Sequence, residues 1–90
     1  MGGEEFCIIL SNANPRTSRD IAERIRTQIE AMAIPTALGP IRTTVSAGIA
    51  YSTGTESIRS LLMRADEALY EAKSAGRNRV QTHDLRHLAA

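Results

Sequence analysis

The residues of this chain with the clearest capacity for chemistry stand at its start, in the run Met1-Gly2-Gly3-Glu4-Glu5-Phe6. A glycine pair adopts backbone angles closed to other residues and lets a bulky ligand approach the main chain. The two carboxylates that follow can hold a hard divalent cation, and a metal beside a glycine turn is a common way to handle phosphates. An ordinary hairpin with solvated glutamates has the same pattern, so other segments must decide between the two interpretations.

Two later segments favour the functional interpretation. Residues 44–50 have the form of a strand with an embedded glycine, and residues 64–80 have the form of a helix that runs through a glycine stop into another strand. All three segments stand in the order and at the spacing seen in GGDEF domains. The chain therefore resembles the C-terminal portion of a diguanylate cyclase. We expect residues 1–82 to be that portion and residues 83–90 to be a tail.

Composition sets broad limits on the class of protein. Ninety residues make one small domain, near the size at which a single core is just stable alone. The net charge of +1 gives no reason to propose nucleic acid or an anionic membrane as a partner. The lone Cys7 lies in an apolar run, and no apolar stretch reaches transmembrane length. Cytoplasm is the expected location, with no membrane contact from this segment.

Apolar patterns predict the first strand and helix. Residues 6–10 are a continuous apolar run, typical of a strand covered on both faces in the middle of a sheet. After a turn at residues 11–15, Thr17 and Asp20 predict a capping box for a helix. That helix carries an apolar stripe and an opposite charged face, which we expect to be solvated. The stripe consists of Ile21, Ala22, Ile25, Ile29 and Met32, and the charged face of Arg19, Glu23, Arg26 and Glu30.

A second strand is predicted after a helix break at residues 33–35 and a turn at residues 39–40. It covers residues 41–51, whose alternate side chains are apolar on one face and small on the other. The small face admits the close approach of either a helix or a ligand, and we favour the helix. Its central members are Ser46, Gly48 and Ala50.

The last elements follow from a 3.6-residue apolar period. This period predicts a helix from Ile58 to a stop at Gly76, followed by a short strand over residues 79–82. Strands that alternate with helices on a sheet indicate the α/β (α+β) class. The resemblance implies the C-terminal part of a ferredoxin-like, palm-type GGDEF fold, in the order strand, helix, strand hairpin, helix, strand.

The resemblance also implies a reaction. Diguanylate cyclases join two GTP molecules into cyclic di-GMP, and pyrophosphate leaves. Each half of a head-to-tail homodimer presents one GTP to the other, and the 3′-hydroxyl of one nucleotide attacks the α-phosphate of its partner. Such a displacement needs a metal, Mg²⁺ or Mn²⁺, to neutralise phosphate charge, a group that receives the hydroxyl proton, and accurate orientation of both substrates.

The resemblance assigns roles to the signature run. Gly2 and Gly3 lie against the nucleotide, and Glu4, the third signature position, is the metal ligand and proposed proton acceptor. Glutamate is a normal family variant there. Because successive strand residues point to opposite faces, Glu5 cannot share the geometry of Glu4 without a local distortion. Glu5 is therefore an additional candidate with a less defined role.

Three basic residues also match family positions. Lys73 and Arg77 match residues that contact the GTP phosphates, and their spacing of four predicts that they share one side of a helix. Cations in a last helical turn also complement the helix dipole, and this alternative stays open. Arg24 lies where some relatives place an arginine of the product-inhibition site.

The chain lacks several parts of the family pattern. These are the Asp-x-Leu-Thr-Gly-Leu-x-Asn-Arg segment, the strand with the first metal-binding aspartate, and the Arg-x-x-Asp product-inhibition motif. A cation attracted to Glu4 alone keeps most of its water and is weakly held. We therefore expect no catalysis by the isolated chain. We also expect it to aggregate, swap domains or stay molten, because the strand at residues 6–10 lacks neighbours.

Two other interpretations remain. One is a degenerate GGDEF module that binds GTP or cyclic di-GMP and regulates a neighbouring domain without chemistry. The other is a nonfunctional gene remnant. The intact signature at residues 2–6 favours the enzyme over the regulatory module, because degenerate modules commonly lose it.

Overall fold

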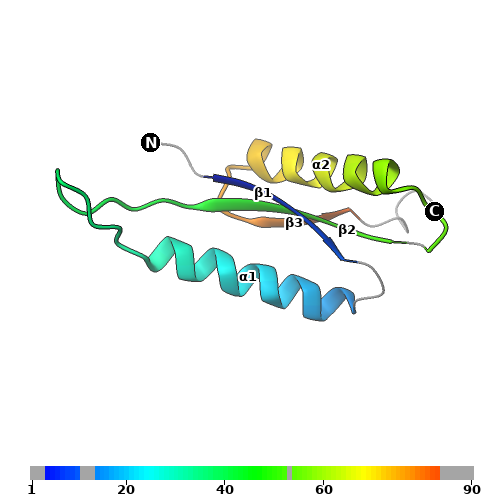
Figure 1. Cartoon of the computed structure of the whole chain (residues 1–90), viewed down its shortest axis with the longest axis horizontal. Coiled ribbons are helices and arrows are strands. Elements are labelled where there is room, and N and C mark those ends of the chain that lie inside the picture. The colour runs from blue at the N-terminus through cyan, green and yellow to red at the C-terminus, as the bar shows by residue number, and fades with distance from the viewer. Residues whose placement is uncertain (1–3, 11–13, 53, 84–90) are drawn as a thin grey trace.

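In the part of the chain that the structure describes, three parallel strands form one sheet between two helices (Figure 1). The computed structural model describes the backbone of residues 4–10, 14–52 and 54–83, and the side chains of the latter two ranges. The elements are β1 (Glu4–Leu10), α1 (Pro15–Ala31), β2 (Val45–Tyr51), α2 (Ile58–Ser74) and β3 (Val80–His83). Helix α1 covers one face of the sheet and α2 the other. This mixture of helix and strand confirms the predicted α/β (α+β) class.

The central strand is β2, whose residues 45–50 are all buried. The prediction that residues 6–10 lie in the middle of the sheet is wrong, because the strand order β1-β2-β3 puts β1 at an edge. The register runs from Glu4 opposite Val45 to Leu10 opposite Tyr51, so β1 uses only one side to pair within the described residues. A continuous apolar run shows that both faces of a strand are covered, but it says nothing about its two edges.

Alternate residues of β2 contact different helices, as the alternation in the sequence predicts. The cluster on the α1 face consists of Ala22, Ala47, Ile49 and Val80. The cluster on the α2 face consists of Ala50, Leu61 and Ala65. Most of these side chains are small, so both helices lie close to the strand.

The close approach of α2 to β2 depends on Gly48. A Cβ atom at this position would lie 2.3 Å from the carbonyl oxygen of Ala65 and 2.4 Å from the amide nitrogen of Leu69. Both are backbone atoms of α2, so neither can give way unless the helix itself shifts. The expectation that the small face of this strand receives a helix rather than a ligand is confirmed.

Helix α1 begins earlier than predicted. Asn14 is its N-cap, and the Asn14 side chain accepts hydrogen bonds from the backbone N–H groups of Arg16 and Thr17. Pro15 occupies the first helical position, where a missing N–H group costs nothing. The predicted capping box of Thr17 and Asp20 is therefore wrong, because Asn14 already satisfies the first amides.

Helix α1 contacts the sheet through small residues. Ser18 and Ala22 are each 2% exposed, whereas Ile21, Ile25 and Met32 of the predicted stripe remain 41–50% exposed. After α1, the predicted hairpin is a single antiparallel bridge between Ile34 and Ile41. Strand β2 accordingly begins at residue 45 rather than 41. No helix of the described residues is long and apolar enough to cross a membrane.

An almost buried ion pair fixes the start of α2. Arg64 donates hydrogen bonds to both carboxylate oxygens of Glu56 and to the carbonyl oxygen of Tyr51. The side chains of Arg64 and Glu56 are 9% and 10% exposed. The hydrogen bond to Glu56 raises the pKa of the Arg64 guanidinium above its ordinary value. This bidentate pair ties the β2–α2 loop to the helix.

We expect Gly48→Ala to destabilise the fold by about 3 kcal/mol or more, because the added methyl group would overlap the backbone of α2. Gly54→Ala is the control. Gly54 has a positive φ of +93°, which side chains disfavour, but a Cβ atom there would meet nothing within 4 Å. Only the backbone cost of about 1–2 kcal/mol then applies. Urea unfolding of the protein from the longest open reading frame that contains this chain, followed by circular dichroism, measures both losses, and equal losses would contradict the close packing at Gly48.

Candidate functional site

The candidate site lies where all three strands begin. We call this region, at Glu4, Val45 and Val80, the amino-terminal end of the sheet. Because the strands are parallel, both connecting helices run back and finish near this end (Figure 1). The start of β1 at Glu4 and the segment after α2 therefore lie at the same end of the sheet.

The register places these two segments on opposite sides of β2. Glu4 pairs with Val45, and Val80 pairs with Ala47. Two strand spacings, about 10 Å, therefore separate the backbone of β1 from that of β3. Glu4 and Glu5 are the first two residues of β1. Gly2 and Gly3, which the resemblance assigns to the nucleotide, lie outside the described residues.

Helix α2 ends in a Schellman motif. The amide of Arg77 donates to the carbonyl oxygen of Ala72 at 2.9 Å, and the amide of Gly76 donates to that of Lys73 at 3.3 Å. Gly76 has a φ of +124°, which confirms the predicted glycine stop. These bonds satisfy carbonyl groups of the last turn without the help of a side chain.

Two residues with side chains continue the left-handed backbone after Gly76. Arg77 has a φ of 65° and Asn78 a φ of 49°. Asparagine tolerates this conformation, whereas for most other residues it costs about 1–2 kcal/mol. The prediction that helical spacing aligns Lys73 with Arg77 is wrong, because α2 ends at Ser74. Lys73 stands in the last turn of the helix, and Arg77 in the loop beyond it.

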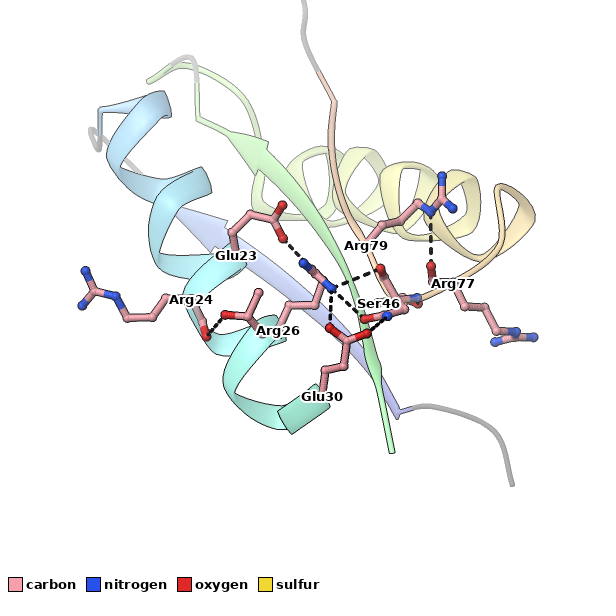
Figure 2. Close-up of polar contacts among 9 residues, drawn as sticks. Glu23, Arg24, Arg26, Glu30, Ser46, Arg77 and Arg79 are labelled. Atoms are coloured by element: carbon pink, nitrogen blue, oxygen red, sulfur yellow. Dashed lines mark hydrogen bonds and ion pairs between the residues drawn. The ribbon is translucent and has the colours of Figure 1, made fainter. Parts of the chain in front are cut away.

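The surroundings of Lys73 and Arg77 differ. Lys73 is the basic residue of the last turn of α2, so the dipole interpretation still applies to it. The Arg77 side chain is exposed and extends away from α1 in Figure 2. Its guanidinium group has no carboxylate partner within the described residues. Since the Schellman motif already caps the helix, capping does not explain Arg77.

Side chains from two elements, β2 and α1, hold Asn78 in place. Its amide donates to Ser46 Oγ of β2 at 3.1 Å. Its side-chain Oδ1 accepts from Arg26 Nη1 at 2.9 Å, and its Nδ2 donates to Glu30 Oε2 at 2.6 Å. Arg26 and Glu30 both belong to α1 and also pair with each other at 3.4 Å. We call these four residues the Asn78 clamp.

The clamp overturns one prediction about α1. The charged face was expected to be solvated, but the Arg26 side chain is only 17% exposed. A hydrogen bond to Glu23 and the nearby charge of Glu30 raise the pKa of the Arg26 guanidinium above its ordinary value. The helical spacing of Arg26 and Glu30 predicts their pairing. It gives no sign of Asn78, which is 52 residues from Arg26.

Arg24 lies apart from these residues. It is exposed on α1, and in Figure 2 its side chain extends in the opposite direction from Arg77. The structure therefore does not bring Arg24 together with Arg77. Its assignment to a product-inhibition site stays a prediction.

The structure shows no formed metal site among residues 14–52 and 54–83. No group of three His, Cys, Asp or Glu side chains gathers there. A magnesium ion takes about six oxygen ligands and keeps several waters. The predicted ligand Glu4 begins β1, at the same end of the sheet as Lys73 and Arg77.

A comparison with protein families identifies the family to which this chain belongs. The sequence model described as "Diguanylate cyclase, GGDEF domain" matches residues 1–79. The chain belongs to the GGDEF family. The matched range of this GGDEF chain includes the signature, the clamp and the end of α2. Membership confirms the resemblance inferred from three short segments, and the family in general requires a divalent metal.

Curated relatives of this GGDEF chain are named as diguanylate cyclases. Diguanylate cyclase A of Treponema denticola is 44% identical over 80 residues, which is 88% of this chain and 22% of that protein. Diguanylate cyclase DgcM of Escherichia coli is 46% identical over 79 residues, 88% of this chain and 18% of that protein. Diguanylate cyclase DgcP of Pseudomonas aeruginosa is 40% identical over 80 residues, which is 89% of this chain and 12% of that protein. The GGDEF chain thus spans about a fifth or less of these relatives.

We expect Gly76→Ala to destabilise the fold by about 1–2 kcal/mol, because a Cβ atom disfavours the backbone that the Schellman motif requires. The new atom would also lie 2.9 Å from the Arg79 guanidinium and displace it. Urea unfolding of the protein from the longest open reading frame that contains this chain measures the loss. Ser74→Ala, at the exposed last residue of α2, is the control and should be nearly neutral. A neutral Gly76→Ala would contradict the left-handed helix end.

Proposed function

We propose that this chain is part of a diguanylate cyclase catalytic domain, which condenses two GTP molecules into cyclic di-GMP and releases pyrophosphate. One observation carries the proposal. In this GGDEF chain, the signature strand begins at the same end of the sheet as that at which the segment with Lys73 and Arg77 lies. A triphosphate that lies across β2 at this end can contact both.

Electrostatics supports a phosphate role for Lys73 and Arg77. The carboxyl ends of α1 and α2 carry partial negative charge, which repels an anion. Arg26 cannot offset this charge, because two carboxylates already surround it. Lys73 and Arg77 supply cations at this place, and Arg77 is exposed. In our proposal, both contact the GTP phosphates.

The signature run holds the reacting end of the nucleotide in this proposal. Gly2 and Gly3 lie against GTP, and Glu4 is a ligand of Mg²⁺ or Mn²⁺ and accepts the proton of the attacking hydroxyl. Bound there, the metal ion neutralises the charge of the phosphate under attack. Glu4 supplies one ligand, and phosphate oxygens, water and groups outside the described residues supply others. Glu5 is an additional carboxylate of the same strand.

The remaining assignments complete the proposal. Two GTP molecules must meet, so we propose a homodimer in which each copy presents one nucleotide. Arg24 is assigned to a product-inhibition site that binds cyclic di-GMP. We place the protein in the cytoplasm, where GTP is found, and propose no role for nucleic acid or a membrane in this segment.

GTP turnover with Mg²⁺ tests the proposal directly. The chain is expressed both alone and from the longest open reading frame that contains it, and cyclic di-GMP is measured by mass spectrometry. We expect product from the longer protein and none from the 90 residues alone. Glu4→Ala should abolish product, because it removes both a metal ligand and the proton acceptor.

The outcomes separate the enzyme from the regulatory module. Product that persists in Glu4→Ala would contradict the role of Glu4. No product from either protein, with GTP or cyclic di-GMP still bound, would instead identify a regulatory GGDEF module. Neither product nor binding would indicate a remnant.

GTP binding tests the phosphate contacts separately from turnover. We expect Lys73→Ala and Arg77→Ala each to weaken GTP binding about tenfold or more, because each variant loses a charge-assisted hydrogen bond to a phosphate. Calorimetry on the longer protein with Mg²⁺ measures the affinity. Arg59→Ala, at an exposed residue near the opposite end of α2, removes the same charge and should leave binding unchanged. Equal losses of GTP affinity in all three variants would show that the effect comes from net charge and not from a specific contact.

A further inference from the structure

We propose that Arg26, Glu30 and Asn78 are positioning residues for Arg77. The pair on α1 holds the Asn78 carboxamide, which keeps the backbone of Arg77 and Asn78 left-handed and so fixes the direction of the Arg77 guanidinium. The inference rests on the proposed function, because it takes a GTP phosphate as the group that Arg77 contacts.

The backbone of Arg77 is the starting point. A residue with a Cβ atom disfavours a φ of 65°, and such conformations persist only where surrounding contacts determine them. If those contacts were lost, Arg77 would relax toward negative φ. Its side chain would then leave the loop in another direction.

The contacts that hold this backbone lie on both sides of Arg77. Before it, its own amide donates to the carbonyl oxygen of Ala72. After it, its carbonyl oxygen accepts from Arg79 Nε at 3.1 Å. The next residue, Asn78, has its amide, Oδ1 and Nδ2 all engaged by the clamp. The base of the Arg77 side chain is fixed while its guanidinium stays exposed.

Glu30 and Glu23 differ in a way that makes the clamp testable. Both pair with Arg26, at 3.4 Å and 2.5 Å respectively. Only Glu30 also accepts from Asn78. A purely structural role, which attaches α1 to the sheet, predicts a loss of stability from the clamp variants but no specific dependence on Arg77.

The test is a double-mutant cycle on GTP affinity, measured by calorimetry with Mg²⁺ on the protein from the longest open reading frame. We expect Asn78→Ala and Glu30→Ala each to weaken GTP binding about tenfold. An effect of this size is typical of coupling within one hydrogen-bond network. In the Arg77→Ala background, Asn78→Ala should have little further effect. Glu30→Gln keeps an acceptor for Asn78 and should bind as the parent does, and so should Glu23→Ala.

A second measurement does not depend on GTP. Hydrogen exchange of the Arg77 and Asn78 amides should accelerate in Asn78→Ala and Glu30→Ala and stay unchanged in Glu23→Ala. If Asn78→Ala fails to fold, Asn78→Gly replaces it, because glycine accepts the left-handed backbone and removes only the carboxamide. Unchanged exchange in the clamp variants would overturn the proposal.

The binding outcomes distinguish this inference from the proposed function. If Asn78→Ala weakens GTP by the same factor with and without Arg77, the clamp does not act through Arg77 and the inference is overturned alone. If Glu23→Ala weakens GTP as much as Glu30→Ala, the clamp is also rejected. If Arg77→Ala leaves GTP affinity unchanged, the phosphate role of Arg77 fails, and the positioning role fails with it.

Discussion

The contact of α2 with the central strand at Gly48 is the constraint on which the rest of the structure depends. With no Cβ atom there, the backbone of α2 lies directly on β2. The chain must then pass from the end of α2 at Ser74 into β3, whose first residue pairs with Ala47. Only five residues, 75–79, make this connection. The Schellman motif and the left-handed residues that follow it are the means by which so short a segment turns.

The position of the candidate site also has an electrostatic consequence. In many α/β proteins, phosphates bind at the carboxyl ends of the strands, where helix N-termini attract them. Here the candidate site lies at the amino-terminal end of the sheet, where helices finish and their dipoles oppose an anion. Anion binding at this end therefore requires cationic side chains. The proposed function assigns this task to Lys73 and Arg77, because Arg26 is already paired with Glu23 and Glu30 on its own helix.

Local patterns predicted much of this fold. The Gly76 stop, the span of α2 and the two faces of β2 are visible in the sequence, because each depends on residues within one element. The place of β1 in the sheet was missed, because strand order depends on neighbours that an apolar run does not identify. The sequence offers two caps for α1, Asn14 and Thr17, and its pattern alone does not decide between them. The structure selects Asn14, whose earlier start Pro15 favours. The clamp needs contacts across 32 to 52 residues, which no period reveals.

The charged face of α1 shows how an ordinary pattern acquires a specific role. An ion pair four residues apart on an exposed helix contributes a few tenths of a kcal/mol and is usually just solvated. Arg26 and Glu30 differ because Asn78 bonds to both of them, through its side-chain Oδ1 and Nδ2. The family resemblance names residues that match a nucleotide-binding pattern one by one. The residues that orient them lie elsewhere in the chain, so a GGDEF domain could keep Arg77 and still lose its geometry through a change on α1.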